Sequence, residues 1–319
     1  MMVLIGTLAL FASVYANTGI ITSFAASAPI TRSSSGLVSS DPLNQQLTMQ
    51  QLEQSSYWTF SGDAISQGAP FNFFENSAGL HIGVQAVSPG TFAGFYAVSP
   101  NTNFVMTHAL VTAPVSTVPQ GIFEAGIYVQ TADGNVNYVT CTSSTTSAGT
   151  IWELVWATGN TMGATNFVTL WSSGTGLPLT ENCQIITNGN NYLKLFLDGR
   201  LVYSSSSLSL QMPSPFQIYL EPETSYSGKE LYASFLNYYL TSGEYLTINN
   251  LPVKATHVVL VSNGHVIARA MKRSGSAMIE MGGFTQPVNA RIEALSSSGA
   301  IVASTSGPVP LFGGDVYSG

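Results

Sequence analysis

A β-hairpin is clearest in the stretch Tyr192-Leu-Lys-Leu-Phe-Leu-Asp-Gly-Arg-Leu-Val-Tyr203. Its two halves are rich in residues that favour strands, and they are separated by Asp198-Gly199. An Asp-Gly pair tolerates the positive φ angles of a type I′ turn, so the turn sets the register of the two strands locally. The stretch therefore predicts two antiparallel strands folded about Asp198-Gly199.

Similar short runs lie on both sides of this hairpin. From Tyr57 onwards, segments rich in Phe, Tyr, Val, Ile and Thr are separated by Gly, Pro, Asn and Ser, which is typical of an antiparallel all-β domain. The expected strands are 121–129, 136–141, 151–157, 166–171, 215–220 and 230–239. Their number suits a β-sandwich or jelly roll over residues 55–241. The hairpin at 192–203 also resembles the strand-turn-strand unit of concanavalin-like and laminin-G-like domains.

A second β unit is predicted over residues 242–319. Its clearest feature is a hairpin from His257 to Ala270 around Asn263-Gly264, and short strands are expected at 245–249, 277–281, 290–295 and 300–304. About seventy-five residues of short strands fit a smaller immunoglobulin-like β-sandwich. The cysteine pair of antibody domains is missing, so the sequence predicts the architecture alone.

The N-terminus has a different composition. Met1 to Thr31 contains no Asp, Glu, Lys, Arg or His, and Pro29 is a natural stop for a helix. An apolar helix over residues 1–30 would be about 40 Å long, and a helix without a polar face must be buried in lipid or in protein. A cleaved signal peptide fits less well, because no basic residue precedes the apolar run. The Ser- and Gln-rich residues 31–54 are expected to be a linker.

This arrangement resembles the archaeal type IV pilin-like proteins, which include archaellins and adhesion pilins. The resemblance rests on the apolar run from Met1 to Tyr15, followed by β-rich domains. It implies a helical homopolymer whose N-terminal helices leave the membrane and pack together in a filament core. Bacterial type IV pilins carry Glu at the fifth mature position, whereas this chain has Ile5. The expected helix-packing residues are Met1, Val3, Leu4, Ile5, Leu8, Leu10, Phe11, Val14, Tyr15, Ile20, Ile21 and Phe24.

The composition argues against a nucleic-acid partner, and the two cysteines indicate a location outside the cytoplasm. Only 8% of residues are charged and the net charge is −7, which argues against nucleic-acid binding because phosphate contacts need clustered Lys and Arg. The two cysteines, Cys141 and Cys183, have no CxxC motif or nearby histidine pair, so a disulfide is their simplest use, and two buried free thiols are the alternative. A disulfide would place the protein outside the cytoplasm.

No catalytic or metal site is expected, and no cofactor. Glu221 and Glu223 form a close acidic pair, but the Glu-x-Asp-x-x-Glu motif of concanavalin-like hydrolases is absent, so a solvated strand end is favoured over glycoside hydrolysis. Asp133 opens a turn without further calcium ligands. The histidines are dispersed and are interpreted as ordinary strand residues; they are His81, His108, His257 and His265.

Two functional classes remain after these exclusions. The first is the structural subunit of an extracellular filament, with itself, the membrane before assembly and other cells or surfaces as partners. The alternative is a membrane-anchored, lectin-like surface binding protein, for which Trp152, Trp156 and Trp171 are candidates for a sugar-stacking platform. A permanent anchor usually has flanking positive charge and interfacial Trp, and here Arg32 alone lies beside the apolar run, which favours the filament.

Overall fold

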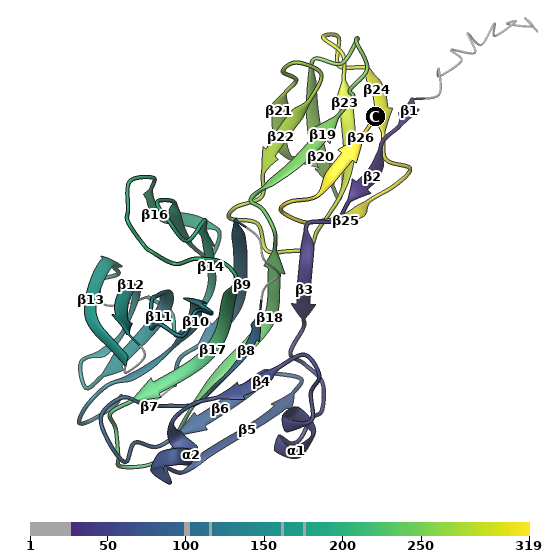
Figure 1. The fold of residues 1–319 in the computed structure, drawn as a ribbon. Helices are drawn as coiled ribbons and strands as arrows, with labels where there is room; N and C mark the ends of the chain where they lie inside the picture. The colour runs from purple at the N-terminus through teal and green to yellow at the C-terminus, as the bar shows by residue number, and fades with distance from the viewer. Residues whose placement is uncertain (1–26, 99–102, 115–116, 161–162, 175–176) are drawn as a thin grey trace, which may run out of the picture.

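The computed structural model describes residues 27–98, 103–114, 117–160, 163–174 and 177–319. This part of the chain is nearly all β. Its helices are α1 (Met49–Glu53) and α2 (Ala64–Gln67), each little more than one turn long. The strands form a larger and a smaller β-sandwich, which lie end to end in Figure 1. The chain passes between the two sandwiches just before residues 37–41 and again at residues 241–245.

The larger sandwich has two eight-stranded sheets. The first sheet has the order β13-β12-β11-β10-β17-β8-β4, and β7 also pairs with β17. Its strands are β4 (Thr59–Ser61), β7 (Thr91–Phe92), β8 (Gly94–Val98), β10 (Phe123–Thr131), β11 (Tyr138–Thr146), β12 (Gly149–Asn160), β13 (Gly163–Ser172) and β17 (Phe216–Thr224).

The second sheet has the order β16-β15-β14-β9-β18-β6-β5, and β3 also pairs with β18. Its strands are β3 (Leu37–Asp41), β5 (Phe71–Asn76), β6 (Gly79–Val84), β9 (Val105–Thr112), β14 (Thr180–Thr187), β15 (Leu193–Leu197), β16 (Arg200–Ser205) and β18 (Leu231–Thr241). The turn between β15 and β16 falls at Asp198 and Gly199, with φ angles of 44° and 76°, as an Asp-Gly type I′ turn requires.

The core of the larger sandwich lies between the two sheets. Side chains alternate along β10, so that Phe123, Ala125, Ile127 and Val129 are fully buried in the core while the intervening side chains lie on the outer face of the first sheet. A disulfide between Cys141 of β11 and Cys183 of β14 links the two sheets through this core.

The smaller sandwich has a four-stranded and a six-stranded sheet, with orders β2-β26-β19-β22 and β1-β24-β23-β20-β21, and β25 also pairs with β23. The four-stranded sheet contains β2 (Thr31–Ser34), β19 (Tyr245–Asn249), β22 (Ala277–Glu280) and β26 (Val316–Ser318). The six-stranded sheet contains β1 (Ala28–Pro29), β20 (His257–Ser262), β21 (His265–Met271), β23 (Val288–Leu295), β24 (Ile301–Ser304) and β25 (Val309–Leu311).

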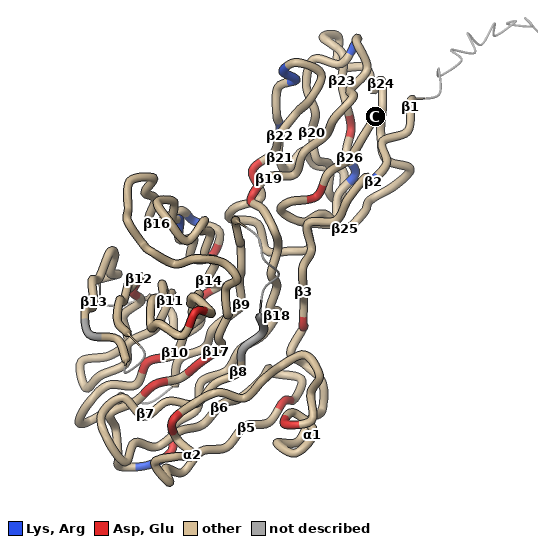
Figure 2. Tube along the Cα trace, in the orientation of Figure 1, with Lys and Arg blue, Asp and Glu red and all other residues tan. Residues whose placement is uncertain are grey.

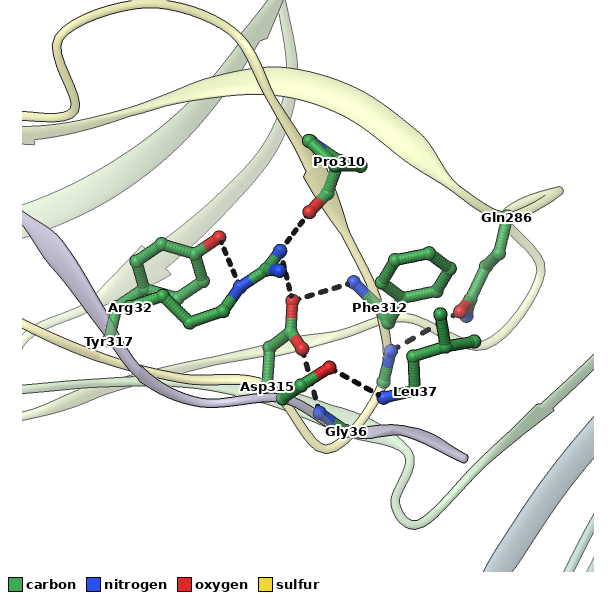
Figure 3. Close-up of polar contacts among 10 residues, drawn as sticks. Arg32, Gly36, Leu37, Gln286, Pro310, Phe312, Asp315 and Tyr317 are labelled. Atoms are coloured by element: carbon green, nitrogen blue, oxygen red, sulfur yellow. Dashed lines mark hydrogen bonds and ion pairs between the residues drawn. The ribbon is translucent and has the colours of Figure 1, made fainter. Parts of the chain in front are cut away.

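Both sheets of the smaller sandwich are completed by residues from near the N-terminus. Strand β1 pairs in parallel with β24, and β2 pairs antiparallel with β26. Figure 3 shows how Arg32 of β2 is held: its guanidinium donates to the Tyr317 hydroxyl, to the Pro310 carbonyl and to the Asp315 carboxylate. Asp315 also accepts the backbone N–H of Gly36 at 2.8 Å. The N-terminal strands are therefore part of the smaller fold.

These strands correct the predicted fold class and the resemblance to type IV pilin-like proteins, which are both wrong. That family leads into its β domain through a long apolar helix, whereas here Ala28 and Pro29 form a strand and the described residues contain no apolar helix. A residue before proline is pushed towards extended geometry, which favours this outcome at Ala28. The rest of the predicted helix, with all its proposed packing positions from Met1 to Phe24, lies outside the described residues. The β-sandwich part of the predicted fold class is confirmed.

Residues 31–54, expected to be a linker, instead contain β2, β3 and α1. The helix α1 begins with a capping box, because the Thr48 hydroxyl accepts the Gln51 N–H and the Gln51 side chain accepts the Thr48 N–H. None of the described helices is long and apolar enough to cross a membrane.

Candidate functional site

A pocket of about 630 Å³ opens at one edge of the larger sandwich, where β13 of the first sheet approaches β16 of the second. Its lining includes the apolar side chains of Trp171, Leu177 and Val202. Pockets of a few hundred Å³ with apolar walls and a few converging polar groups are the usual form of a small-molecule site. This edge pocket is the candidate functional site.

Trp171 reaches the pocket because of an irregularity in β13. Trp171 pairs with Leu154, but the next pair is Thr169 with Val155, so Leu170 is an extra residue in β13. Such a bulge bends the strand and changes the direction of neighbouring side chains. The Trp171 ring is half-buried, packing against the core of the sandwich while it lines the pocket.

The polar groups of the pocket come from the second sheet. Asp198 occupies the turn between β15 and β16, and its carboxylate accepts the Asn182 N–H at 2.8 Å, which fixes the turn against β14. Glu181 of β14 is 4% exposed, and its side chain lies on the same face of the strand as the buried Cys183. The carboxyl group of Glu181 therefore enters the edge pocket from between the two sheets.

Glu181 and Asp198 form a hydrogen-bonded acid pair. Burial raises the pKa of Glu181 to about 7, and the neighbouring charge of Asp198 and the hydrogen bond between them act in the same direction. Near neutral pH the Glu181 carboxyl group is therefore protonated for part of the time. Arg200 follows in the same turn and is exposed, and within the described residues no ion pair occupies its guanidinium.

The three tryptophans proposed as a platform are not brought together. Trp152 is fully buried, with its indole N–H donated to the Pro178 carbonyl at 2.9 Å. Trp156 packs against the same core, and its buried indole nitrogen has no partner among the described atoms. Trp171 is the one of the three that lines the edge pocket.

The other sequence candidates lie apart from one another. His108 is almost fully buried, which lowers its pKa to about 4, and His81 contacts Asn76 and Ser234. Asp133 caps a turn by accepting the Asn135 N–H. Among the described residues, no group of three His, Cys, Asp or Glu side chains is placed to hold a metal ion.

Glu221 and Glu223 are not the solvated strand end that the sequence indicated. They lie on the outer face of the first sheet, where Glu221 is 8% exposed and Glu223 is half-buried. Glu124 of the neighbouring strand β10 lies beside them. In Figure 2 the acidic segments of β10 and β17 lie close together with no basic segment between them.

Sequence reasoning also missed the roles of Glu181, Asp198 and Arg200. Asp198 and Arg200 stood in the hairpin that was recognised, but only as turn residues. Their meeting with Glu181 and Trp171 depends on how two different sheets approach each other at an edge. No local pattern in the sequence reports that approach.

No protein-family model and no curated protein matches this sequence. Similar solved structures include the carbohydrate recognition domain of Emp46p, at 12% identity and a TM-score of 0.43, covering 64% of this chain and 96% of that chain. Endo-β-1,3-glucanase from Pyrococcus furiosus is similar at 12% identity and a TM-score of 0.43, covering 64% and 93%. The carbohydrate-binding module CBM66 from Bacillus subtilis is similar at 10% identity and a TM-score of 0.37, covering 59% and 98%. These low values establish no shared ligand, so the function must be inferred from this chain's own geometry.

Proposed function

We propose that this protein is a lectin-like binding protein whose edge pocket takes a neutral sugar residue of a surface glycan. A pyranose ring has an apolar face of C–H groups and an edge of hydroxyls. Trp171 offers an aromatic surface for the apolar face of the sugar. The hydroxyls of the sugar can form hydrogen bonds with Glu181, Asp198 and Arg200. The observation that carries the proposal is that Trp171 and the acid pair of Glu181 and Asp198 line one pocket.

We propose binding without catalysis at this pocket. Glycoside hydrolysis needs two carboxyl groups about 5 to 10 Å apart, on opposite sides of the scissile bond. Glu181 and Asp198 instead interact directly with each other, and the Asp198 carboxylate also accepts the Asn182 N–H, so the two groups do not suit opposite sides of a scissile bond. An adjacent pair of this kind suits bidentate recognition of neighbouring hydroxyls.

We propose that the protein acts outside the cytoplasm, at a cell surface. The disulfide between Cys141 and Cys183 supports this, because structural disulfides persist in oxidising compartments. The scarcity of basic residues is consistent with a partner other than nucleic acid. The filament interpretation depended on the pilin-like helix and is not carried forward.

The test is binding of the purified chain to immobilised neutral oligosaccharides of glucose, mannose and galactose, followed by calorimetry on those retained. Wild-type protein should bind at least one of them, and Trp171→Ala should weaken that binding by ten-fold or more. Arg200→Met changes an exposed residue and should weaken binding without affecting the fold. The matched control is Phe167→Ala, which removes a 63% exposed aromatic ring from the same strand.

Two results would overturn the proposal. The first is that wild-type protein retains none of these sugars. The second is that both Trp171→Ala and Arg200→Met bind as tightly as wild type, which would place any sugar site elsewhere on the molecule.

A further inference from the structure

A second set of polar side chains lies on the outer face of the first sheet, well away from the edge strand β13. In the pairing of β10 with β17, Glu124 is directly opposite Glu223, Gly126 is opposite Glu221, and Tyr128 is opposite Tyr219. Directly opposed residues of an antiparallel pair have Cβ atoms about 5 Å apart. We refer to Glu124, Glu221, Glu223 and Tyr128 as the acidic strip.

The acidic strip is sheltered although it faces outwards. Tyr128 is only 4% exposed and Glu221 only 8%. Gly126 lies between Glu124 and Tyr128 along β10 and has no side chain; a Cβ there would come within 2.3 Å of the Cys141 carbonyl oxygen. A small pocket of about 150 Å³ opens at one end of the strip, between Glu124, Glu223, Gly90 and Ile122. A small polar group therefore has space to approach the carboxyl groups of Glu124 and Glu223.

The groups of the acidic strip are unpartnered in the part of the chain that the structure describes. Among the described residues, no hydrogen bond or ion pair is made by the three carboxyl groups, and none by the Tyr128 hydroxyl, although Tyr128 makes an edge contact with the Tyr138 ring. The ionisable groups that face the strip from neighbouring residues and elements are Asp63, Glu153, Tyr138 and Tyr219, and none of them is basic. Burying several carboxyl groups without a cation costs free energy. An external ligand with a positive charge would reduce this cost.

A metal ion is a poor fit for this position. The described residues contain no group of three acidic, His or Cys side chains placed to ligate one, so the carboxylates are not gathered around a single point. An ammonium group has different requirements, because its three N–H donors can be shared among separated acceptors. Aromatic faces beside the site also attract organic cations.

We propose that the acidic strip binds an organic ammonium group, seated between Glu124 and Glu223, with the Tyr128 hydroxyl and Glu221 as further acceptors. Two kinds of ligand carry this group: an oligosaccharide with free 2-amino groups, and a linear polyamine. The same carboxylates and phenol hydroxyl would bind the ammonium group of either ligand. This site is separate from the edge pocket, so its failure in an experiment would leave the proposed sugar pocket untouched.

Binding at the acidic strip must release protons. Burial, followed by the charges of neighbouring carboxylates, raises the pKa of Glu124 to about 7 and that of Glu223 to about 7, so that both are partly protonated at neutral pH. A bound ammonium group favours the ionised carboxylates. Binding at pH 7 should therefore release close to one proton for each ammonium group bound.

The test is calorimetric titration of the full chain at pH 7 with three probes: glucosamine trimer, N-acetylglucosamine trimer and spermidine. Each titration is run in phosphate and in HEPES, because the difference in heat between these buffers measures the protons released. We expect glucosamine trimer to bind with proton release, and any binding of the acetylated trimer to occur without it. Binding of spermidine with no binding of glucosamine trimer would support the ammonium site and assign it to polyamines.

Substitutions test whether the binding occurs at the acidic strip. Glu223→Gln and Glu124→Gln should each weaken binding by ten-fold or more and reduce the proton release, and Tyr128→Phe should weaken binding about three-fold. The matched control is Glu53→Gln, an exposed residue of α1, which should bind like wild type. Equal proton release on binding of the acetylated and free-amine trimers, absence of binding by both ammonium probes, or unchanged binding by both glutamine variants would each overturn the proposal.

Discussion

Glu124 of β10 lies directly opposite Glu223 of β17, and among the described residues no positively charged side chain lies between the two carboxyl groups. Like charges in this arrangement destabilise a sheet. A protein retains such a pair only if the rest of the fold is stable enough to hold it. The pair therefore has consequences for stability that can be measured without any ligand.

We predict that the protein is more stable at pH 5 than at pH 8. The pKa of Glu223 is raised from 4.5 to about 7, so the folded state holds its proton more tightly than the unfolded state. The stability from this group is fully present below about pH 4.5 and is lost as the pH rises through 7. For one such group the loss is about 3 kcal/mol, and the loss for two coupled groups is less than the sum.

Urea denaturation of wild type and Glu223→Gln at the two pH values measures this effect. The glutamine variant should be more stable than wild type at pH 8 and should show a smaller difference between pH 5 and pH 8. A wild-type protein that is equally stable at both values, or a variant destabilised at pH 8, would contradict the prediction.

The outer-face pair also shows where sequence reasoning reached its limit. The alternation that buries Phe123 and Ile127 is local, so the strands could be predicted from their composition and turns. Glu124 and Glu223 are close only because β10 pairs with β17, and about ninety residues separate these strands in the sequence. Without that pairing, the sequence suggested a solvated position for Glu223.

The N-terminal strands were missed for a related reason. Residues 31–34 are a run of Thr, Arg and Ser with no apolar pattern, and all four are exposed. Their strand conformation depends on contacts outside the segment. These residues pair with β26, and the preceding Ile30 is 4% exposed in the core of the smaller sandwich. A polar segment that adds a strand to a distant sheet has the composition of a linker.

We predict that sugar binding at the edge pocket weakens above pH 7. The protonated carboxyl of Glu181, whose pKa is raised to about 7, can donate a hydrogen bond to a sugar hydroxyl, whereas the ionised group repels Asp198. Affinity for a neutral oligosaccharide should fall several-fold between pH 6 and pH 8.5. Glu181→Gln, which cannot ionise, should bind with no such pH dependence, and an unchanged pH profile in this variant would show that Glu181 is not the titrating group.

We predict that opening the disulfide destabilises the larger sandwich. Cys141 and Cys183 are 42 residues apart and lie in opposite sheets, so the bond restricts the unfolded chain as well as joining the two layers. A loop of this size corresponds to about 4 kcal/mol. The double variant Cys141→Ala/Cys183→Ala should lose about this amount in urea denaturation, and a reducing agent should affect wild type but not the variant. A loss below 1 kcal/mol would contradict the prediction.

We predict that Asp315 secures the N-terminal strands to the smaller sandwich. Its fully buried carboxylate accepts the backbone N–H of Gly36 at 2.8 Å and that of Phe312 at 3.0 Å, in addition to its ion pair with Arg32. Asp315→Ala would leave two amide donors without an acceptor and should cost about 3 kcal/mol. Arg32→Met removes a partly exposed partner and should cost about 1 kcal/mol or less.

Hydrogen exchange distinguishes this role from a general loss of stability. In Asp315→Ala the Gly36 and Phe312 amides should exchange much faster than in wild type, while amides of β10 in the larger sandwich keep their protection. Since β2 and β3 follow one another in the chain, loss of the Gly36 contact should also increase exchange in β3. If Asp315→Ala costs no more than Arg32→Met, and the Gly36 amide stays protected, another group must hold the N-terminal strands in place.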